Sequence, residues 1–378
     1  DYVAGYRRPN VVTVQALHNL HLQPAAPSLY GPLSKSKAGL LRRIDDYDLM
    51  AVLTEKQGQD LIHAGFGDED IRVIPNSRAL PPAVTVERRD PNRGVMAVRL
   101  SWQKHPQEAV RVMIAAHRLN PSISLDFYGD GYEAPKVSAL VEEAHASSYI
   151  RLKGYDSAAS EQFKTASFSL LTSRFEGQGL VLLESMAAGC IPIAYDIRYG
   201  PSDIITDGVD GFLVPSGDTE GMARVIDGVS RMPEPELAAM RVAARKRAED
   251  FSDAALLPTW GRELERARRR HRSVRLAAPA LTDTRLEYGD AQLTVSCVVS
   301  GAPAEADTTW FVAFDVPKQP HFGRVPAVLS HREDGAAVLT AAIAVERLME
   351  SPLGSHVHFA VDGVVPGDHR RVKVPAVP

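Results

Sequence analysis

The sequence predicts an α/β protein with a parallel, doubly wound sheet, followed by a separate all-β domain. Two observations support this fold class. Between Val11 and Val214, short apolar segments with strand character alternate with helical segments, as in parallel sheets whose strands are joined by crossover helices. After Ala277-Ala278-Pro279 the helical pattern ends, and strand segments follow one another with Gly, Pro and Asp turns between them.

The first predicted elements lie near the amino terminus. A helix is expected over Glu55–Ala64, where apolar residues recur with helical spacing. The strand after this helix runs into a Pro-Asn turn, which is typical of a hinge between domains. The strands predicted in this part are Val11–Ala16, Leu49–Leu53 and Ile71–Asn76.

The middle of the chain shows the clearest alternation. Helices are expected from Pro106 onward and over Leu180–Ala188. Glycine-rich turns close several of the strands. The strands predicted here are Val95–Leu100, Ile123–Tyr128, Tyr149–Leu152, Phe168–Thr172 and Ile191–Tyr195, with a turn and strand over Gly208–Val214.

The carboxyl-terminal part is expected to be a β-sandwich-like appendage and to serve as a binding or assembly module. Its strands are Leu293–Val299, Thr309–Phe314, Ala336–Ile343 and His356–Val361. Its histidines are scattered rather than clustered, so surface or core positions are a better interpretation than metal binding. They are His321, His331, His356, His358 and His369.

The composition is that of a soluble globular protein, with 44% hydrophobic and 24% charged residues. No long apolar run predicts a transmembrane helix, and no signal-peptide pattern is visible. The net charge of −4 argues against bulk attraction to nucleic acid. The two cysteines, Cys190 and Cys297, suggest neither a disulfide framework nor a metal site.

The segment SRFEGQGLVLLESMAAGCIPIAYDIRYGP, from Ser173 to Pro201, is the most informative of the chain. Its glycines, Gly177 and Gly179, lie at a strand-to-helix turn, where free backbone N–H groups and the helix dipole favour an anion. Glu176 lies in this turn, and Glu184 lies about two turns into the helix. Two carboxylates in these places can hold hydroxyls on two parts of one phosphate-bearing ligand.

Two cations follow another strand of the predicted sheet. Arg99 lies at the end of one predicted strand, and Lys104 lies just before the helix that begins at Pro106. The carboxyl ends of parallel strands meet at one edge of the sheet, where open α/β sheets bind ligands. We therefore expect both cations to lie near the two carboxylates.

The order of these motifs resembles the carboxyl-terminal half of the retaining glycosyltransferases with the GT-B fold, in the group 1 family. The resemblance covers roughly Tyr47 to Ser252. It is based on five motifs in order: RLSWQK, FYGDGY, RLKGY, SRFEGQGLVLLESMAAG and DGVDGFLV. The motif YDIRYGPSDII, from Tyr195 to Ile205, is similar to the subgroup that glycosylates wall teichoic acids or Ser-rich adhesins.

The resemblance implies a role for each matching residue. Arg99 and Lys104 would hold the diphosphate and neutralise the leaving group, which suits cations placed where charge develops. Glu184 would bind the ribose hydroxyls, and Glu176 would lie near the hydroxyls of the donor sugar. The remaining substrate-binding residues are the backbone segments near the phosphates and the base: Gly129, Lys153, Gly154, Tyr155, Gly177, Gln178, Gly179 and Leu180.

The family also has a histidine after a strand of its amino-terminal half, where it faces the donor sugar near the reacting bond. His18 is the first candidate in this sequence, and His21 is the second. A structural histidine at a strand end is the alternative. No metal ion and no cofactor beyond the nucleotide sugar is implied.

The resemblance predicts a two-Rossmann GT-B architecture whose amino-terminal half is incomplete. The chain begins with Asp1, and only about ninety residues precede the second half, so the first strands and much of the acceptor site are expected to be absent. The predicted domains are 1–87 (partial amino-terminal Rossmann), 88–252 (nucleotide-sugar binding), 253–275 (closing helix) and 280–378 (β appendage).

The function implied is transfer of a hexose, glucose or N-acetylglucosamine, from a UDP-sugar to a hydroxyl of a teichoic acid or a protein. The alternative is a non-catalytic GT-B partner that binds acceptor and stabilises an active subunit. An epimerase or a phosphorylase is a third hypothesis, although no pyridoxal phosphate lysine context is visible. The presence of both cations and both carboxylates favours the enzyme.

A basic segment, RELERARRRHRSVR, runs from Arg262 to Arg275. Two interpretations are open for it: a solvated helix end before a linker, or a surface that adsorbs to anionic lipids. We expect a cytoplasmic protein. Peripheral contact with the inner face of the membrane is one option. Homo- or hetero-oligomers are compatible with the sequence, and nucleic acid is not an expected partner.

Overall fold

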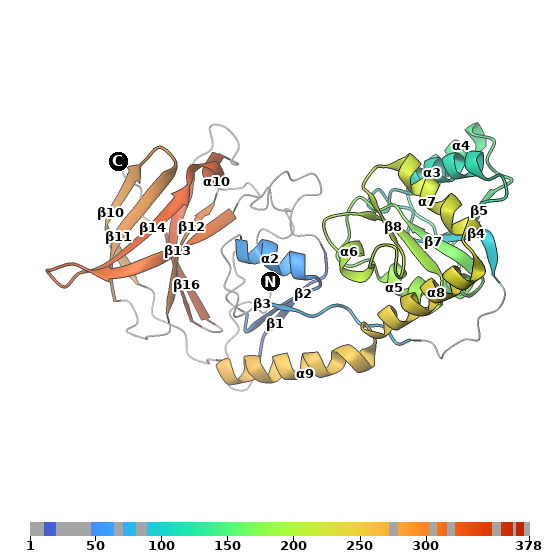
Figure 1. Ribbon diagram of the computed structural model, residues 1–378. Coiled ribbons are helices and arrows are strands. Elements are labelled where there is room, and N and C mark those ends of the chain that lie inside the picture. Colours follow the sequence, from blue (N-terminus) through green and yellow to red (C-terminus); the bar gives the residue numbers. More distant parts are fainter. Residues whose placement is uncertain are drawn as a thin grey trace. The chain divides into compact units, whose positions relative to one another are not determined.

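The computed structural model describes residues 11–19, 47–63, 71–80, 89–271, 279–301, 308–315, 322–349, 357–365 and 368–373. The chain divides into two compact units (Figure 1). One unit combines Asp1–Val73 with Trp260–Pro378, and the other is the continuous stretch Ile74–Thr259.

The unit Ile74–Thr259 is built on a six-stranded parallel sheet in the order β6-β5-β4-β7-β8-β9. Strands β4, β5 and β6 follow one another from the centre of the sheet to one edge. Strands β7, β8 and β9 then follow one another from the centre to the other edge. This order is that of a doubly wound sheet, with its switch point between β4 and β7. The bounds are β4 (Asp90–Ala97), β5 (Ser124–Tyr128), β6 (Ile150–Gly154), β7 (Ala166–Leu171), β8 (Ile191–Asp196) and β9 (Phe212–Pro215).

Helices cover both faces of this sheet. In Figure 1, α3, α4 and α7 lie on one side of it, and α5 and α8 lie on the other. Apolar side chains from the strands and from both helix layers form one buried core. The bounds are α3 (Pro106–Leu119), α4 (Ala134–Glu143), the 3-10 helix η2 (Ala159–Lys164), α5 (Leu180–Ala187), α6 (Pro201–Ile204), α7 (Thr219–Arg231) and α8 (Glu234–Glu249).

A buried carboxylate links three neighbouring strands. Asp126 on β5 accepts hydrogen bonds from Arg93 on β4 at 2.8 Å and from Arg151 on β6 at 2.6 Å. Burial alone would raise the pKa of Asp126, but the hydrogen bonds from the two guanidinium groups outweigh it and hold the pKa below its usual value. The ionised carboxylate of Asp126 therefore helps to hold β4, β5 and β6 together.

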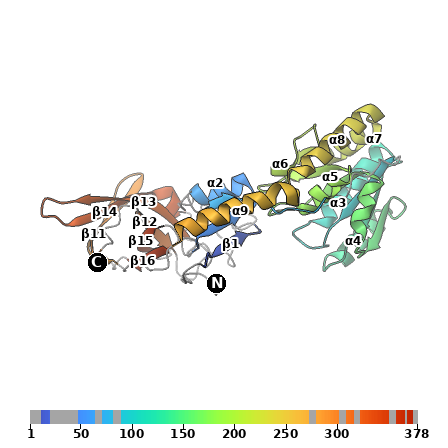
Figure 2. The same cartoon turned by 90° about the horizontal axis from the view of Figure 1, so that it is seen from below.

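The other unit contains a three-stranded parallel sheet, β1 (Val14–Leu17), β2 (Leu49–Val52) and β3 (Ile71–Val73), with helix α2 (Glu55–His63). Helix α9 (Asp253–Arg270) is a single long helix in Figures 1 and 2. Arg72 in β3 pairs with Glu263 in this helix at 3.1 Å, and Asp48, just before β2, pairs with His271, just after the helix, at 2.8 Å.

The carboxyl-terminal residues form a seven-stranded antiparallel sheet in the order β10-β11-β14-β13-β12-β15-β16. Strand β13 pairs with β12 through its first half and with β14 through its second half. One apolar core collects side chains from both parts of the sheet. The bounds are β10 (Ala280–Tyr288), β11 (Gln292–Ser300), β12 (Thr309–Asp315), β13 (Phe322–His331), β14 (Ala337–Ala344), α10 (Val345–Met349), β15 (His358–Val365) and β16 (Asp368–Lys373).

The predicted combination of parallel α/β structure and a carboxyl-terminal β region is confirmed. The bounds of some elements differ from the prediction. Strand β4 begins at Asp90 rather than Val95 and ends at Ala97 rather than Leu100, so Arg99 lies beyond the strand. Strands β10, β13 and β16 and the helices α4, α6, α7, α8 and α10 were not predicted by position. Pro91 and Gly94 in β4, and Pro326 in β13, conceal strand character, because proline and glycine disfavour strand interiors.

Candidate functional site

The loops that follow β4 and β7 meet at the switch point of the six-stranded sheet. The Nζ atom of Lys104, after β4, lies 2.6 Å from Oε1 of Glu176, after β7. The hydroxyl of Ser173 donates to the same carboxylate oxygen at 2.6 Å. Glu176 is buried, whereas part of the Lys104 side chain is accessible. Lys104 and Glu176, which were predicted to lie close together, thus form a direct ion pair.

Further hydrogen bonds hold the two loops together. The backbone N–H of Arg174 donates to the carbonyl of Gln103 at 2.8 Å, and the Gln103 side chain donates to the carbonyl of Phe175 at 3.1 Å. His105, next to Lys104, is half-buried, and its pKa is lowered first by burial and then by the nearby Arg174 charge. The imidazole is therefore neutral at pH 7, so Arg99 and Lys104 provide the positive charge of this loop.

The turn before α5 has the geometry of an anion-binding loop. Gly179 has a left-handed backbone (φ 88°) and precedes Leu180, the first residue of α5. The first N–H groups of a helix lack intrahelical partners, which favours negative charge at this helix start. Below the turn, Gly200 approaches the backbone of Gln178 so closely that a Cβ atom would lie 2.3 Å from the Gln178 carbonyl oxygen. This approach explains the glycine in the YDIRYGPSD motif.

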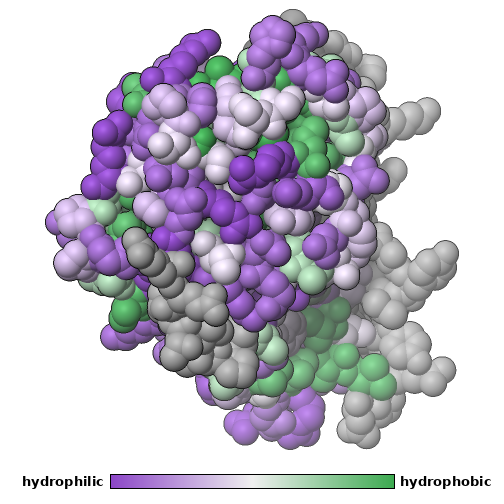
Figure 3. All heavy atoms as spheres, turned by 90° about the vertical axis from the view of Figure 1, so that its right-hand side faces the viewer, coloured by the Kyte–Doolittle hydropathy of each residue, from purple (hydrophilic) through white to green (hydrophobic). Residues whose placement is uncertain are grey.

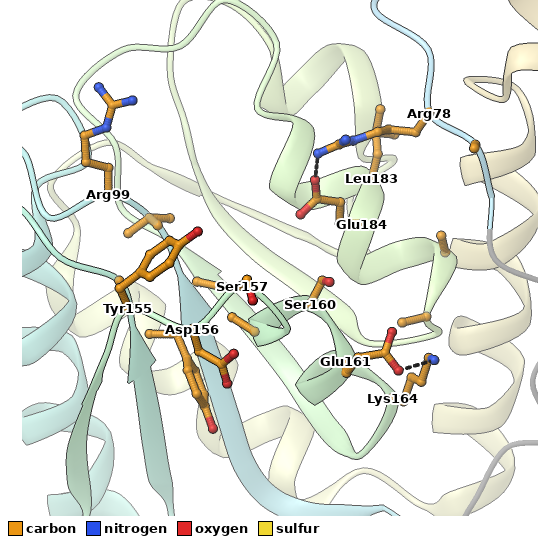
Figure 4. A pocket seen from close by; sticks show the side chains of 18 of the residues that line it. Arg78, Arg99, Tyr155, Asp156, Ser157, Ser160, Glu161, Lys164, Leu183 and Glu184 are labelled. Carbon is orange, nitrogen blue, oxygen red and sulfur yellow. Dashed lines mark hydrogen bonds and ion pairs between the residues drawn. The ribbon is translucent and has the colours of Figure 1, made fainter.

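A cavity of about 880 Å³ opens beside these loops, within the unit Ile74–Thr259 (Figure 4). Arg99 and Glu184 lie on opposite sides of it in the close-up view, and Tyr155 and Asp156 lie below Arg99. Both η2 and α5 contribute polar and apolar side chains to the wall. The residues that line it are Arg78–Leu80, Ala97–Arg99, Tyr128–Asp130, Tyr155–Ser157, Ala159–Glu161, Lys164, Leu183, Glu184, Ala187 and Ala188.

Four of the residues singled out in the sequence line this cavity: Arg99, Gly129, Tyr155 and Glu184. The loop residues Lys104, Glu176, Gly177, Gln178, Gly179 and Leu180 do not line it.

Lys153 and Gly154 are exposed and also lie outside the cavity wall. The Gly154 carbonyl accepts a hydrogen bond from the Gly129 N–H at 2.8 Å, which joins the ends of β5 and β6.

The candidate histidines lie in the other unit. His18 is exposed and directly follows β1. His21 lies outside the described residues, as do His321 and His356. Among the residues that the structure describes, no group of three His, Cys, Asp or Glu side chains is arranged to hold a metal ion.

Several cavity residues were not identified from the sequence. Arg78 is the most important, because its guanidinium pairs with the Glu184 carboxylate (Figure 4). A lone arginine in a Pro-Asn-Ser loop gives no sequence signal of a site. Ser173 was also missed, although its position three residues before Glu176 fits a local hydrogen bond.

Most charges around the site are paired. Lys104 pairs with Glu176 and Arg78 with Glu184, whereas Arg99 makes no ion pair with any described residue. The cavity wall also carries the carboxylates of Asp130 and Asp156, and Arg99 is the guanidinium of the wall that pairs with no described carboxylate. An anionic ligand would gain a charge-assisted contact there without displacing an existing pair.

The molecular surface gives little further information on the site. The face shown in Figure 3 is predominantly hydrophilic, with hydrophobic residues only in separate patches. Within the described part of the chain, no helix has the length and apolar character needed to cross a membrane.

Comparison with known proteins shows a family match within the part of the chain that carries this site. Residues 82–247 match the family model described as Glycosyl transferases group 1. The GtfA subunit of the UDP-N-acetylglucosamine–peptide N-acetylglucosaminyltransferase of Streptococcus gordonii is 35% identical over 175 residues, which are 45% of this chain and 34% of that protein. The poly(glycerol-phosphate) alpha-glucosyltransferase of Bacillus subtilis is 28% identical over 218 residues, 57% of this chain and 32% of that protein.

A similar solved structure is that of the pneumococcal O-GlcNAc transferase GtfA in complex with UDP and GlcNAc. It aligns with a TM-score of 0.60 and 27% identity, and covers 67% of this chain and 52% of that one. The chain spans about a third of the length of the two curated relatives above.

Proposed function

We propose that this chain, whose residues 82–247 form a domain of the group 1 glycosyltransferases, transfers a hexose from a UDP-sugar to a hydroxyl of a wall polymer or a protein. The sugar is glucose or N-acetylglucosamine, and the acceptor is a teichoic acid or a peptide hydroxyl. The names of the two relatives support these choices, because one transfers glucose to poly(glycerol-phosphate) and the other N-acetylglucosamine to peptide.

The observation that carries the proposal is the arrangement at the switch point. The cavity is lined by Arg99, which makes no ion pair with a described residue, and it lies beside a glycine turn at a helix start. The Lys104–Glu176 pair lies at the same edge. This combination suits a diphosphate-bearing ligand. It suits a sugar nucleotide because Glu184 offers a carboxylate for ribose hydroxyls.

In the proposed mechanism, Arg99, Lys104 and the N–H groups of Gly177–Gly179 stabilise the negative charge that develops on the departing diphosphate. Leu180, the first residue of α5, contributes its helix start to the same anion site. Glu184 binds the ribose, and the backbone of Lys153, Gly154 and Tyr155, with Gly129 beside it, faces the base. Each role rests on the family resemblance together with the position of the residue.

Glu176 orients hydroxyls of the donor sugar, and its hydrogen bonds to Lys104 and Ser173 fix its orientation. His18 is assigned to the donor sugar near the reacting bond. The acceptor attacks from the face that the diphosphate leaves, so the configuration is retained, and no metal ion takes part.

The wider organisation is part of the same proposal. We divide the chain into a partial amino-terminal Rossmann domain (1–87), a nucleotide-sugar domain (88–252), a closing helix (253–275) and a β-sandwich-like appendage (280–378). Together the first two domains make a GT-B architecture. The proposed location is cytoplasmic, with the basic segment of α9 as a point of contact with the inner membrane face.

A second candidate is a non-catalytic partner that binds acceptor and stabilises an active subunit. The Streptococcus gordonii relative is named as a subunit, and this name is compatible with both homo- and hetero-oligomers. The enzyme is better supported, since a partner without catalysis would have no need of Arg99, Lys104, Glu176 and Glu184 together.

The decisive experiment measures sugar transfer and donor hydrolysis by the chain with UDP-, GDP- and ADP-sugars and a teichoic acid acceptor. We expect turnover with one UDP-sugar. Lys104→Ala should lower kcat by about 100-fold, as expected for loss of one charge-stabilising group. Lys136→Ala is the matched control, because Lys136 forms a surface pair with Glu133. No turnover and no UDP binding would refute the proposal, and firm binding of a second glycosyltransferase chain would support the partner.

A further inference from the structure

The segment that begins the unit Ile74–Thr259 reaches the candidate donor site directly. Arg78 lines the cavity and pairs with Glu184, the carboxylate assigned to the ribose. Two residues earlier, the backbone of Asn76 and the side-chain amide of Gln178 exchange two hydrogen bonds, at 2.8 and 3.3 Å. One short segment therefore contacts both the anion-binding turn and the α5 carboxylate.

The backbone of Arg78 is itself fixed. Its N–H donates to the carbonyl of Phe251 at 3.0 Å, and its carbonyl accepts from the N–H of Asp253 at 3.2 Å. The hydroxyl of the preceding Ser77 donates to Asp253 Oδ1. The guanidinium of Arg78 is thus presented to Glu184 from an anchored backbone, so only side-chain entropy remains to be lost when the pair forms.

The charge of Glu184 poses a problem for a diphosphate ligand. A carboxylate is a strong acceptor for hydroxyl groups, yet its negative charge in the cavity repels an anionic nucleotide. The only ion pair that Glu184 makes with described residues is the one with Arg78. This pair engages Oε1, and the carboxylate has a second oxygen that can accept from a ligand.

We propose that Arg78 is a positioning residue of the donor site, which neutralises and orients Glu184 so that this carboxylate can bind a ribose beside a diphosphate. The inference rests on the proposed function, since it concerns the same nucleotide. Arg78 acts through Glu184 rather than on the phosphates. The ligand therefore contacts Glu184 and not Arg78.

Calorimetric titration of the full chain with UDP tests this role. Arg78→Gln should weaken UDP binding about tenfold, Arg78→Lys should restore most of the affinity, and Arg231→Gln should leave it unchanged. Arg231 is the matched control because it forms an exposed pair with Asp227 away from the cavity. Melting temperatures of all variants verify that each is folded.

A double-mutant cycle separates positioning from direct contact. In a Glu184→Gln background, which itself weakens UDP binding, Arg78→Gln should have no additional effect. An equal tenfold loss in both backgrounds would overturn the positioning role and assign Arg78 to the nucleotide itself. Unchanged binding by Arg78→Gln in the wild-type background would overturn the inference entirely. Absence of UDP binding by the wild-type chain would instead refute the proposed function.

Discussion

At the scale of single residues, the candidate site is defined by which charges are paired. Glu176 is held by Lys104 and Ser173, and Glu184 by Arg78, whereas Arg99 has no ion-pair partner in the described part of the chain. A site of this kind is organised before a ligand arrives. Preorganised charge contributes more to transition-state stabilisation than charge that must first reorient.

The two cysteines give a prediction at the same scale. Burial raises the pKa of Cys190 to about 12 and that of Cys297 to about 11. The thiolate is the reactive form, so at pH 8 almost none is present in the folded chain. We expect no reaction with a thiol reagent in native buffer at pH 8, and two thiols titrated after unfolding in guanidinium. Rapid labelling of either cysteine in the folded protein would contradict this burial.

At the scale of elements, Gly129 shows how tightly the strand ends pack. Its φ is 129°, and a Cβ atom would lie 1.8 Å from the carbonyl oxygen of Val98, just after β4. Gly129→Ala should therefore lower the free energy of unfolding by about 3 kcal/mol, from strain and overpacking together. Denaturant titration measures the change. Gly208→Ala is the control, since Gly208 has a left-handed φ but open space around it, and should cost about 1 kcal/mol.

The Arg93–Asp126–Arg151 cluster predicts a pH dependence. Because the pKa of folded Asp126 is held below its usual value, the ionised carboxylate adds stability above about pH 3.9, the unfolded value. This contribution is lost as the pH falls through the folded pKa. Asp126→Asn should lower the unfolding free energy by about 2 kcal/mol at pH 7.

The difference between wild type and Asp126→Asn should shrink in denaturant titrations repeated below pH 3. Asp227→Asn serves as the comparison, because its pair with Arg231 is exposed on one helix. A constant difference between pH 7 and pH 2.5 would show that Asp126 acts through packing and not through its charge.

The sequence predicted most of the central elements and some of the site. Regular apolar segments such as Ile191–Asp196 and Leu180–Ala187 were found almost to the residue, because their periodicity is undisturbed. The Lys104–Glu176 contact followed from the shared edge of a parallel sheet. Arg78 could not be found, since its role depends on a contact with Glu184 across 106 positions of the chain. Strand β10 was missed because half-exposed polar strands lack a strong pattern.

At the scale of the whole molecule, one compact unit is assembled from both ends of the chain. Within that unit, the buried carboxylate of Asp48 accepts hydrogen bonds from the Thr13 N–H at 2.7 Å and the Thr13 hydroxyl at 2.9 Å. Its other oxygen lies 2.8 Å from Nδ1 of His271. A single side chain thus joins three segments that are far apart in the sequence.

Asp48→Ala should leave these donors without a partner and destabilise the three-stranded sheet by about 2–3 kcal/mol. Hydrogen exchange measures this by region: amides of Leu49–Val52 should exchange faster, and those of Ala166–Leu171 should be unchanged. Asp283→Ala, which removes an exposed carboxylate of the carboxyl-terminal sheet, is the control. Uniformly faster exchange throughout the chain would mean that the two units do not unfold separately.

The division of the chain also sets an order of events during synthesis. Residues 74–259 leave the ribosome as one uninterrupted stretch, so the contacts within this unit can form once Thr259 is made. The strands β1–β3 emerge earlier, yet their contacts with Glu263 and His271 exist only after those residues are translated. At roughly 5–20 residues per second, the earliest strands wait on the order of ten seconds or more for these contacts. Strands β1–β3 are thus made before residues 74–259, yet their contacts are completed after those of residues 74–259.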